Sequence, residues 1–226
     1  MSKFIASSVS ALLIAASPAL ADGFYISGSI SGVTLDHSIE RNNGGADAPG
    51  PGGIIVSDTS GTTLATETGA GFGIGLGYEQ SIGNGLFWGA EAFYTAHDIN
   101  TTNLNGVLVT DLDLEATYGA RGIFGAEVTD RFNVYAHVGI VQAEFDVDNS
   151  YTFAPPSTSD SFEETGVSYG VGASYAINDQ IGVFAEYTQI ADIDFDGIGE
   201  VAGNTGRVNP NDLDLSSIAL GVKYSF

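Results

Sequence analysis

The sequence predicts an all-β fold, and three observations support this prediction. Eight segments carry apolar residues at every second position, which is the period of a β-strand with two different faces. The connections between these segments alternate between long and short, as is typical of antiparallel neighbours in a membrane barrel. The last segment ends on Tyr224 and Phe226, both on its apolar face, where a lipid-facing strand meets the headgroups. Together these features predict an eight-stranded antiparallel up-and-down transmembrane β-barrel.

The expected strands follow one another with no helical segment between them. Their ranges in chain order are 24–35, 67–79, 86–98, 110–126, 132–147, 164–177, 181–191 and 212–226. In the first strand, Phe24 and Ile26 face one way and Ser27 the other. The second strand alternates large residues with glycines, which leaves room inside a barrel for side chains from opposite strands. The single Trp88 lies at the start of the third strand, where an interfacial anchor is expected.

The fourth strand shows the same alternation over its whole length. The period predicts Leu112, Leu114 and Ala116 on the outer face. It places Asp113 and Glu115 on the inner face. The later strands keep apolar residues outside and small or polar residues inside.

Four long loops and three tight turns connect these strands. The long loops are expected at 36–66, 99–109, 148–162 and 192–211, and the turns at 80–85, 127–130 and 178–180. Pro155 and Pro156 support the third loop, because proline is not tolerated in a central strand. This order predicts that both termini and the tight turns are periplasmic, whereas the long loops are extracellular.

The amino terminus has the pattern of a secretory signal. Lys3 precedes an apolar run at 4–16, and Ala19-Leu20-Ala21 forms a small-residue cleavage site. The apolar run is too short for a transmembrane helix. We therefore expect residues 1–21 to be removed and residues 22–226 to form the barrel.

Composition excludes several classes of function. With 6 Lys and Arg against 28 Asp and Glu, the chain has a net charge of −22 and would repel nucleic acid. It has no Cys, so it can form neither a disulfide framework nor a thiolate metal site. No cofactor is expected.

The closing pattern of apolar residues at alternate positions and a final Phe226 resembles the signal by which bacterial outer-membrane barrels are recognised by their assembly machinery. Residues 22–226 as a whole resemble small outer-membrane β-barrels of the OmpA, OmpX and opacity-protein type. The resemblance implies an integral outer-membrane protein in contact with lipid, lipopolysaccharide and the barrel assembly machinery. It also implies roles in envelope integrity, adhesion or interaction with host molecules through the acidic extracellular loops.

A set of charged residues is predicted to share one layer of the lumen. All lie on inward faces: Glu91, Arg121, His137, Glu186 and Lys223. The first four are each five residues from the turn end of their strand, and Lys223 is three residues from it. An eight-stranded barrel is only wide enough for side chains to fill, so opposite charges there should pair and close the lumen. The alternative is a narrow porin-like channel for ions or small solutes.

One further pattern suggests a weaker site. Asp192, Asp194 and Asp196 imitate the start of a calcium loop, but the twelfth position is Gly203 where an EF-hand supplies Glu. The alternative is a loop that is simply acidic or that shares divalent ions with lipopolysaccharide phosphates.

An enzyme that modifies lipids requires a nucleophile and a base within reach of each other. Of the three histidines, His37 and His97 lie near the loops and His137 faces the lumen, and none has an outward-facing His-x-Ser arrangement. No enzymatic activity is therefore expected. A soluble lipocalin-like barrel is the structural alternative, with its apolar face inside. The charges on the polar face favour the membrane barrel.

Overall fold

The structure is a computed structural model that describes residues 23–42, 62–105, 108–151, 154–193 and 207–226. Within these residues every regular element is a β-strand. The strands are β1 (Phe24–Asn42), β2 (Thr62–Gly83), β3 (Leu86–Asn105), β4 (Leu108–Thr129), β5 (Phe132–Tyr151), β6 (Ala154–Ala176), β7 (Ile181–Ile193) and β8 (Arg207–Ser225). No helix in the described part of the chain is long and apolar enough to cross a membrane.

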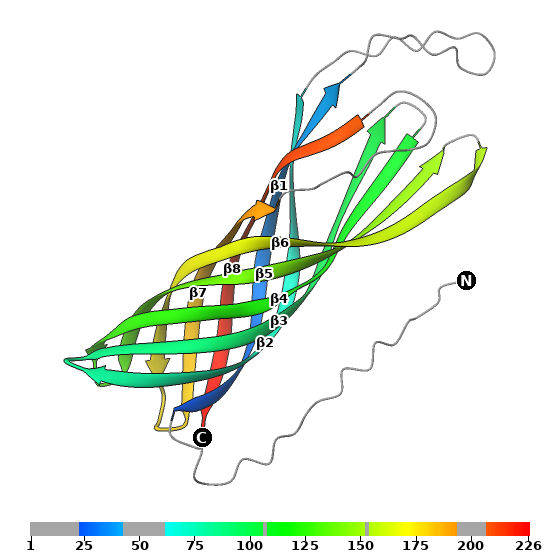
Figure 1. The fold of residues 1–226 in the computed structure, drawn as a ribbon. Coiled ribbons are helices and arrows are strands. Elements are labelled where there is room, and N and C mark those ends of the chain that lie inside the picture. Colours follow the sequence, from blue (N-terminus) through cyan, green and yellow to red (C-terminus); the bar gives the residue numbers. More distant parts are fainter. Residues whose placement is uncertain (1–22, 43–61, 106–107, 152–153, 194–206) are drawn as a thin grey trace.

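The strands form a closed antiparallel barrel (Figure 1). Each strand pairs with the next along the chain, and β1 pairs with β8 to close the sheet. The closing register places Gly28 opposite Val222 and Ile30 opposite Leu220. These pairs keep the apolar faces of both strands on the same side. The predicted fold, an eight-stranded up-and-down barrel, is confirmed.

The apolar face of the barrel points outward. Phe72, Ile140 and Ile218 are 66%, 66% and 65% exposed, whereas their inward neighbours along the strands are buried or half-buried. Large apolar side chains on the outside require an apolar solvent, because a water-soluble protein rarely exposes so continuous a surface. The lipocalin-like alternative, which needs the opposite arrangement, is therefore excluded.

One end of the barrel carries the tight turns, and we call it the turn end. The last residues of β8 also lie there, as the position of the C-terminus in Figure 1 shows. In the β2–β3 turn, Gly83, Asn84 and Gly85 all have positive φ, the conformation that suits Asn-Gly in short hairpins. Aromatic residues surround this end: Phe24 and Tyr78 have ring centroids 4.9 Å apart.

The opposite end, which we call the loop end, has longer strands than the sequence predicted. Most of the expected loops at 99–109 and 148–162 is strand, and the other two expected loops are shortened by strand at their margins. The connections that remain are 43–61, 106–107, 152–153 and 194–206. Hairpins can continue beyond the lipid because the ladder satisfies the backbone while water solvates both faces. Polar sequence was therefore a poor indicator of where a strand ends.

The interpretation of Pro155 and Pro156 as loop residues was wrong. Both lie within β6, at a register shift opposite Asn149–Tyr151 where the ladder skips residues. A bulge requires no N–H from the skipped residues, so proline is accommodated there.

The predicted faces of β4 are also wrong at its loop end. Leu114 and Ala116 are buried inside the barrel, and Glu115 is exposed on the outside. The cause is a register shift between Leu114 and Ala116 in the β4–β5 ladder. One extra residue in a strand moves every following side chain to the opposite face.

Candidate functional site: the barrel lumen

The lumen is filled by three layers of side chains, stacked from the turn end to the loop end. The aromatic layer consists of Tyr25, Phe87, Tyr135 and Phe184. The charged layer consists of Glu91, Arg121, His137 and Glu186. The apolar plug consists of Val33, Leu35, Ile99, Leu114, Val141, Ala143, Phe145, Ile190 and Leu215. Each layer draws side chains from several strands.

Arg121 is the centre of the charged layer. Its Nη2 lies 2.6 Å from Glu91 Oε1, and its Nη1 lies 2.6 Å from Glu186 Oε1. The Nε also donates to Glu91 Oε1 at 2.9 Å. The side chains of Arg121, Glu91 and Glu186 are only 13%, 4% and 6% exposed. One guanidinium therefore bridges two carboxylates across the lumen, with little water to screen them.

Neighbouring side chains also donate to the two carboxylates, beginning with Ser27 Oγ, which lies 3.4 Å from Glu91 Oε2. The Tyr135 hydroxyl donates to Glu186 Oε2 at 3.1 Å, and Thr188 donates to Glu186 Oε1 at 3.2 Å. The Phe93 ring lies beneath the guanidinium, with its centroid 5.5 Å from Arg121 Cζ. Buried charges with this many partners are held in a single arrangement.

Strand register explains why these residues meet. Glu91 and Arg121 are directly opposite each other on β3 and β4. Gly139 faces Arg121 from β5, and a side chain there would overlap the arginine. Gly172 similarly leaves room for the Tyr135 ring. Inward glycines thus provide the space that the charged and aromatic layers occupy.

Lys223 does not join the charged layer. Its Nζ lies 2.7 Å from Glu79 Oε2 and 4.8 Å from the centroid of the Tyr25 ring, closer to the turn end. The sequence reasoning missed Glu79 as the partner. The signal was present, because Glu79 continues the inward-facing glycine series of β2.

His137 contacts the charged layer at its edge. The Nε2 lies 3.3 Å from Thr188 Oγ1 and 3.7 Å from Glu186 Oε1. Among the described residues, His137 Nδ1 has no hydrogen-bond partner. His97, further toward the loop end, has its Nε2 2.9 Å from Thr117 Oγ1.

The apolar plug was not predicted. Leu35, Val141 and Phe145 are completely buried, whereas the outward neighbours of the β5 pair, Gln142 and Glu144, are polar. The available signal was in β5, where Val141, Ala143 and Phe145 continue the inward series after Gly139. In this part of β5 the apolar face is therefore the inward one, and the polar outer face is of the kind that water solvates.

Two small cavities remain between the layers. One, of about 80 Å³, lies beside Glu91, Arg121 and Thr117; the other, of about 20 Å³, lies beside Tyr25 and Lys223. Spaces of this size and polarity suit a few ordered waters. Neither is large enough to pass a hydrated solute.

The remaining candidate sites lie at the two ends of the chain's last hairpin. Tyr224 and Phe226 are on the outer face at the turn end, with ring centroids 5.3 Å apart and edge to face. Asp194 and Asp196 are outside the described residues, as is the side chain of Asp192. Within the described part, no three His, Asp or Glu side chains are placed to share a metal ion.

Comparison with known proteins places this architecture in a family. No curated protein matches the sequence. Among solved structures, Neisserial surface protein A is 16% identical with a TM-score of 0.51, covering 91% of this chain and 98% of that one. Ail of Yersinia pestis (14%, TM-score 0.43) and OprG of Pseudomonas aeruginosa (15%, TM-score 0.44) each align with 91% of this chain and with 99% and 96% of their own. At 16% identity, the similarity to Neisserial surface protein A shows a shared fold and nothing finer.

The family model for the outer membrane protein beta-barrel domain matches residues 4–226. The described barrel has the outward apolar face and the closed antiparallel sheet that such a domain needs in a bilayer. The chain therefore belongs to the outer membrane protein beta-barrel domain family.

Proposed function

We propose that this protein is a closed, non-conducting outer-membrane barrel that displays acidic hairpins and loops at the cell surface. The observation that supports this proposal best is the double closure of the lumen. An ion that crossed the barrel would have to break the Arg121 pairs and then pass the dry apolar plug. Both steps are costly, because removing one partner of a buried pair costs about 3 to 5 kcal/mol and an apolar layer offers an ion no hydration.

Measurements of ion conductance through the refolded protein distinguish a closed barrel from a narrow channel. The refolded parent should be silent in planar bilayers, apart from rare brief events. Frequent, stable openings that pass small solutes would reject the proposal and establish the narrow pore.

We infer that the loop end faces the outside of the cell and that the termini are periplasmic. The support is the asymmetry of the barrel, with three tight turns at one end and extended hairpins at the other. An epitope inserted at 106–107 should be reached by antibody on intact cells, whereas one at Asn84 should require permeabilised cells. The reverse result would invert the topology.

The extended hairpins offer a surface for a cationic partner. The outer face of β4, β5 and β6 beyond the lipid carries Glu115, Glu144, Asp146, Asp148 and Glu163. Like charges are directly opposite each other in the pairs Asp113–Asp146 and Glu144–Glu163. Such pairs are unfavourable unless a cation lies near them, which favours basic surfaces or ion-bridged lipopolysaccharide as partners.

The adhesion role is tested with cells that display the parent or a variant with Glu115→Gln, Glu144→Gln and Asp146→Asn. Parent cells should bind immobilised polylysine more strongly than variant cells. Salt at about 0.5 M should abolish this difference, because it screens the attraction between exposed charges. Equal binding of parent and variant cells to polylysine at low salt would show that the acidic hairpins are not the adhesive surface. Chelation of divalent ions tests the lipopolysaccharide contact separately.

The enzyme alternative gains no support from the lumen. Thr188, His137 and Glu186 meet there, but the hydroxyl and the carboxylate both contact the same histidine nitrogen, Nε2. A hydrolytic triad needs the nucleophile and the acid on opposite nitrogens of the base. The group is also enclosed between the charged layer and the apolar plug, where no substrate reaches it.

A further inference from the structure

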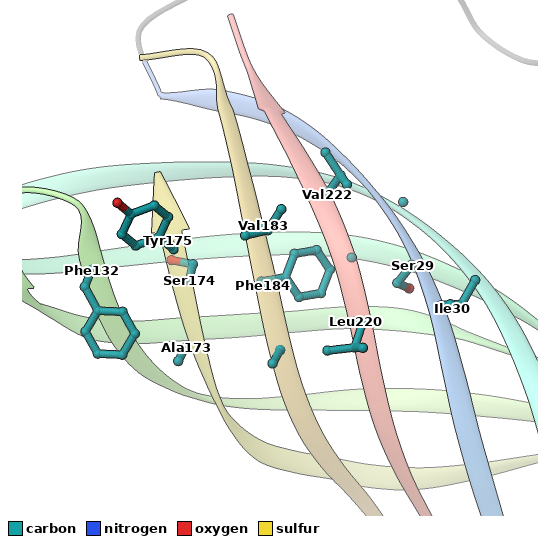
Figure 2. A pocket seen from close by; sticks show the side chains of 13 residues that line it. Ser29, Ile30, Phe132, Ala173, Ser174, Tyr175, Val183, Phe184, Leu220 and Val222 are labelled. Carbon is teal, nitrogen blue, oxygen red and sulfur yellow. The ribbon is translucent and has the colours of Figure 1, made fainter. Parts of the chain in front are cut away.

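A groove of about 710 Å³ lies on the outer wall of the barrel (Figure 2). It crosses β5, β6, β7, β8 and β1. One row of paired residues along it is Phe132, Tyr175, Val183, Val222 and Gly28, each opposite the next. The adjacent row contains Ala173, Ala185, Leu220 and Ile30.

Small residues make the groove deep. The small lining residues Gly28, Ala173 and Ala185, which we call its floor, alternate with larger ones such as Phe132, Tyr175 and Ile30. At Gly28 no atom lies within 4 Å of the position of a Cβ. The outer face of β2 differs, since Phe72, Ile74 and Leu76 follow one another at its outward positions with no small residue between them.

The groove has about the length of an acyl chain and runs obliquely up the barrel wall, because its row crosses strands that are tilted by about 35–45° in such barrels. Its row of pairs spans five strands, so four interstrand steps of about 4.8 Å give about 19 Å. One leaflet of a bilayer contributes about 15 Å of hydrocarbon. The row begins at the first residue of β5 and reaches Gly28, the fifth residue of β1. It thus rises from the turn end toward the middle of the membrane, as a lipid tail does below its headgroup.

The turn end of the groove offers charges to a headgroup. Arg131 directly precedes Phe132, is exposed, and its carbonyl accepts a hydrogen bond from Ala176 N at 2.8 Å, which holds it beside Tyr175. No ion pair among the described residues includes Arg131. Asp179 is exposed in the adjacent β6–β7 turn. A guanidinium is suited to a phosphate, and a carboxylate to a primary ammonium.

We propose that this groove binds one phosphatidylethanolamine molecule, with an acyl chain along the floor, the phosphate at Arg131 and the ammonium at Asp179. Charge complementarity selects this lipid, because its headgroup carries both charges that the two turns can pair. Continuity with the lipid-facing apolar surface supplies access from the bilayer. The proposal depends on the barrel lying in a membrane and is independent of whether the lumen conducts.

Native mass spectrometry of refolded, lipid-free protein tests the proposal. Phosphatidylethanolamine and phosphatidylglycerol with the same acyl chains are the two probes. The parent should retain one phosphatidylethanolamine, with an affinity at least about fivefold above that for phosphatidylglycerol, a difference of about 1 kcal/mol. Ala185→Phe fills the floor and should reduce binding of both lipids about tenfold. Ala90→Phe, on an exposed position of β3 outside the groove, is the matched control and should bind like the parent.

Variants of Arg131 and Asp179 test the contacts with the phosphate and with the ammonium of the headgroup one at a time. Arg131→Gln should weaken both lipids, because both carry the phosphate. Asp179→Asn should weaken phosphatidylethanolamine alone. Ala173→Leu repeats the floor test if Ala185→Phe does not fold, and heat-dependent gel migration reports folding of every variant. Binding that is unchanged in the floor variants, or equal for the two lipids in the parent, would overturn the proposal.

Discussion

At the scale of single residues, the most consequential side chain is Arg121. Replacing it with alanine leaves Glu91 and Glu186 buried without a cation. We expect Arg121→Ala to lower the free energy of unfolding by about 3 to 5 kcal/mol. Urea unfolding in phospholipid-free detergent micelles, followed by tryptophan fluorescence of Trp88, measures this change.

The matched control for that variant is Arg131→Ala, since Arg131 is exposed and has no ion pair among the described residues. Its effect on unfolding should stay within about 0.5 kcal/mol. Adding Glu91→Gln and Glu186→Gln to Arg121→Ala should recover most of the loss, because no uncompensated charge then remains. Equal stability of the two single arginine variants would show that the charged layer is not paired as described.

At the scale of elements, the hairpin of β4 and β5 beyond the lipid responds to pH. The pKa of Glu115, which lies past the last lipid-facing residues of β4, is raised by partial burial and by the nearby Asp146, Asp113 and Glu144. The paired hairpin therefore binds a proton more readily than the opened one. Protonated Glu115 therefore stabilises the paired hairpin at low pH. This stabilisation is lost as the pH rises through the raised pKa of Glu115.

Amide hydrogen exchange, corrected for intrinsic rates, measures that pH dependence. Protection of the β4–β5 hairpin near Glu115 should increase by a few tenths of a kcal/mol between pH 7 and pH 5, the size of an exposed cross-strand charge effect. Glu115→Gln should remove most of the dependence and leave the rest of β4 unchanged. If the amide protection of the hairpin, after correction for intrinsic exchange rates, falls between pH 7 and pH 5, the predicted stabilisation by protonation of Glu115 is wrong.

The last strand supplies a second prediction at the scale of elements. Changing Tyr224 and Phe226 together to Ser should block assembly into the outer membrane while secretion continues, because the aromatic end of β8 is the expected assembly signal. Immunoblots of membrane and periplasmic fractions report both steps. Tyr187→Ser with Phe124→Ser, two aromatics with comparable exposure on other strands, is the control and should assemble. Normal outer-membrane levels of the terminal variant would show that Tyr224 and Phe226 are not the assembly signal.

At the scale of the whole molecule, the charged layer and the apolar plug act as two seals in series. A variant with Glu91→Gln, Arg121→Gln and Glu186→Gln should stay silent in planar bilayers, and so should one with Leu35→Ala and Phe145→Ala. Only the combination should conduct, since a permeating ion must pass both layers. Openings in either variant alone would mean that one layer closes the lumen without the other.

The sequence by itself determined the class of fold and the direction of most side chains in the lipid-spanning part. The period of two is a local property of each strand, and the apolar face of β8 or the glycines of β2 could be recognised without knowing their neighbours. The inward positions of Glu91, Arg121, His137 and Glu186 follow from the same period.

Only the tertiary structure decided which inward residues touch. Three features depend on the register between strands. They are the ion pair of Lys223 with Glu79, the inward position of Leu114 and Ala116, and the apolar plug around Phe145. Register and bulges are set by pairing across the whole closed sheet, and a single inserted residue reverses every face beyond it. The extent of the strands at the loop end is decided in the same way, because a hairpin continues for as long as its neighbour supplies hydrogen-bond partners, whatever the polarity of its side chains.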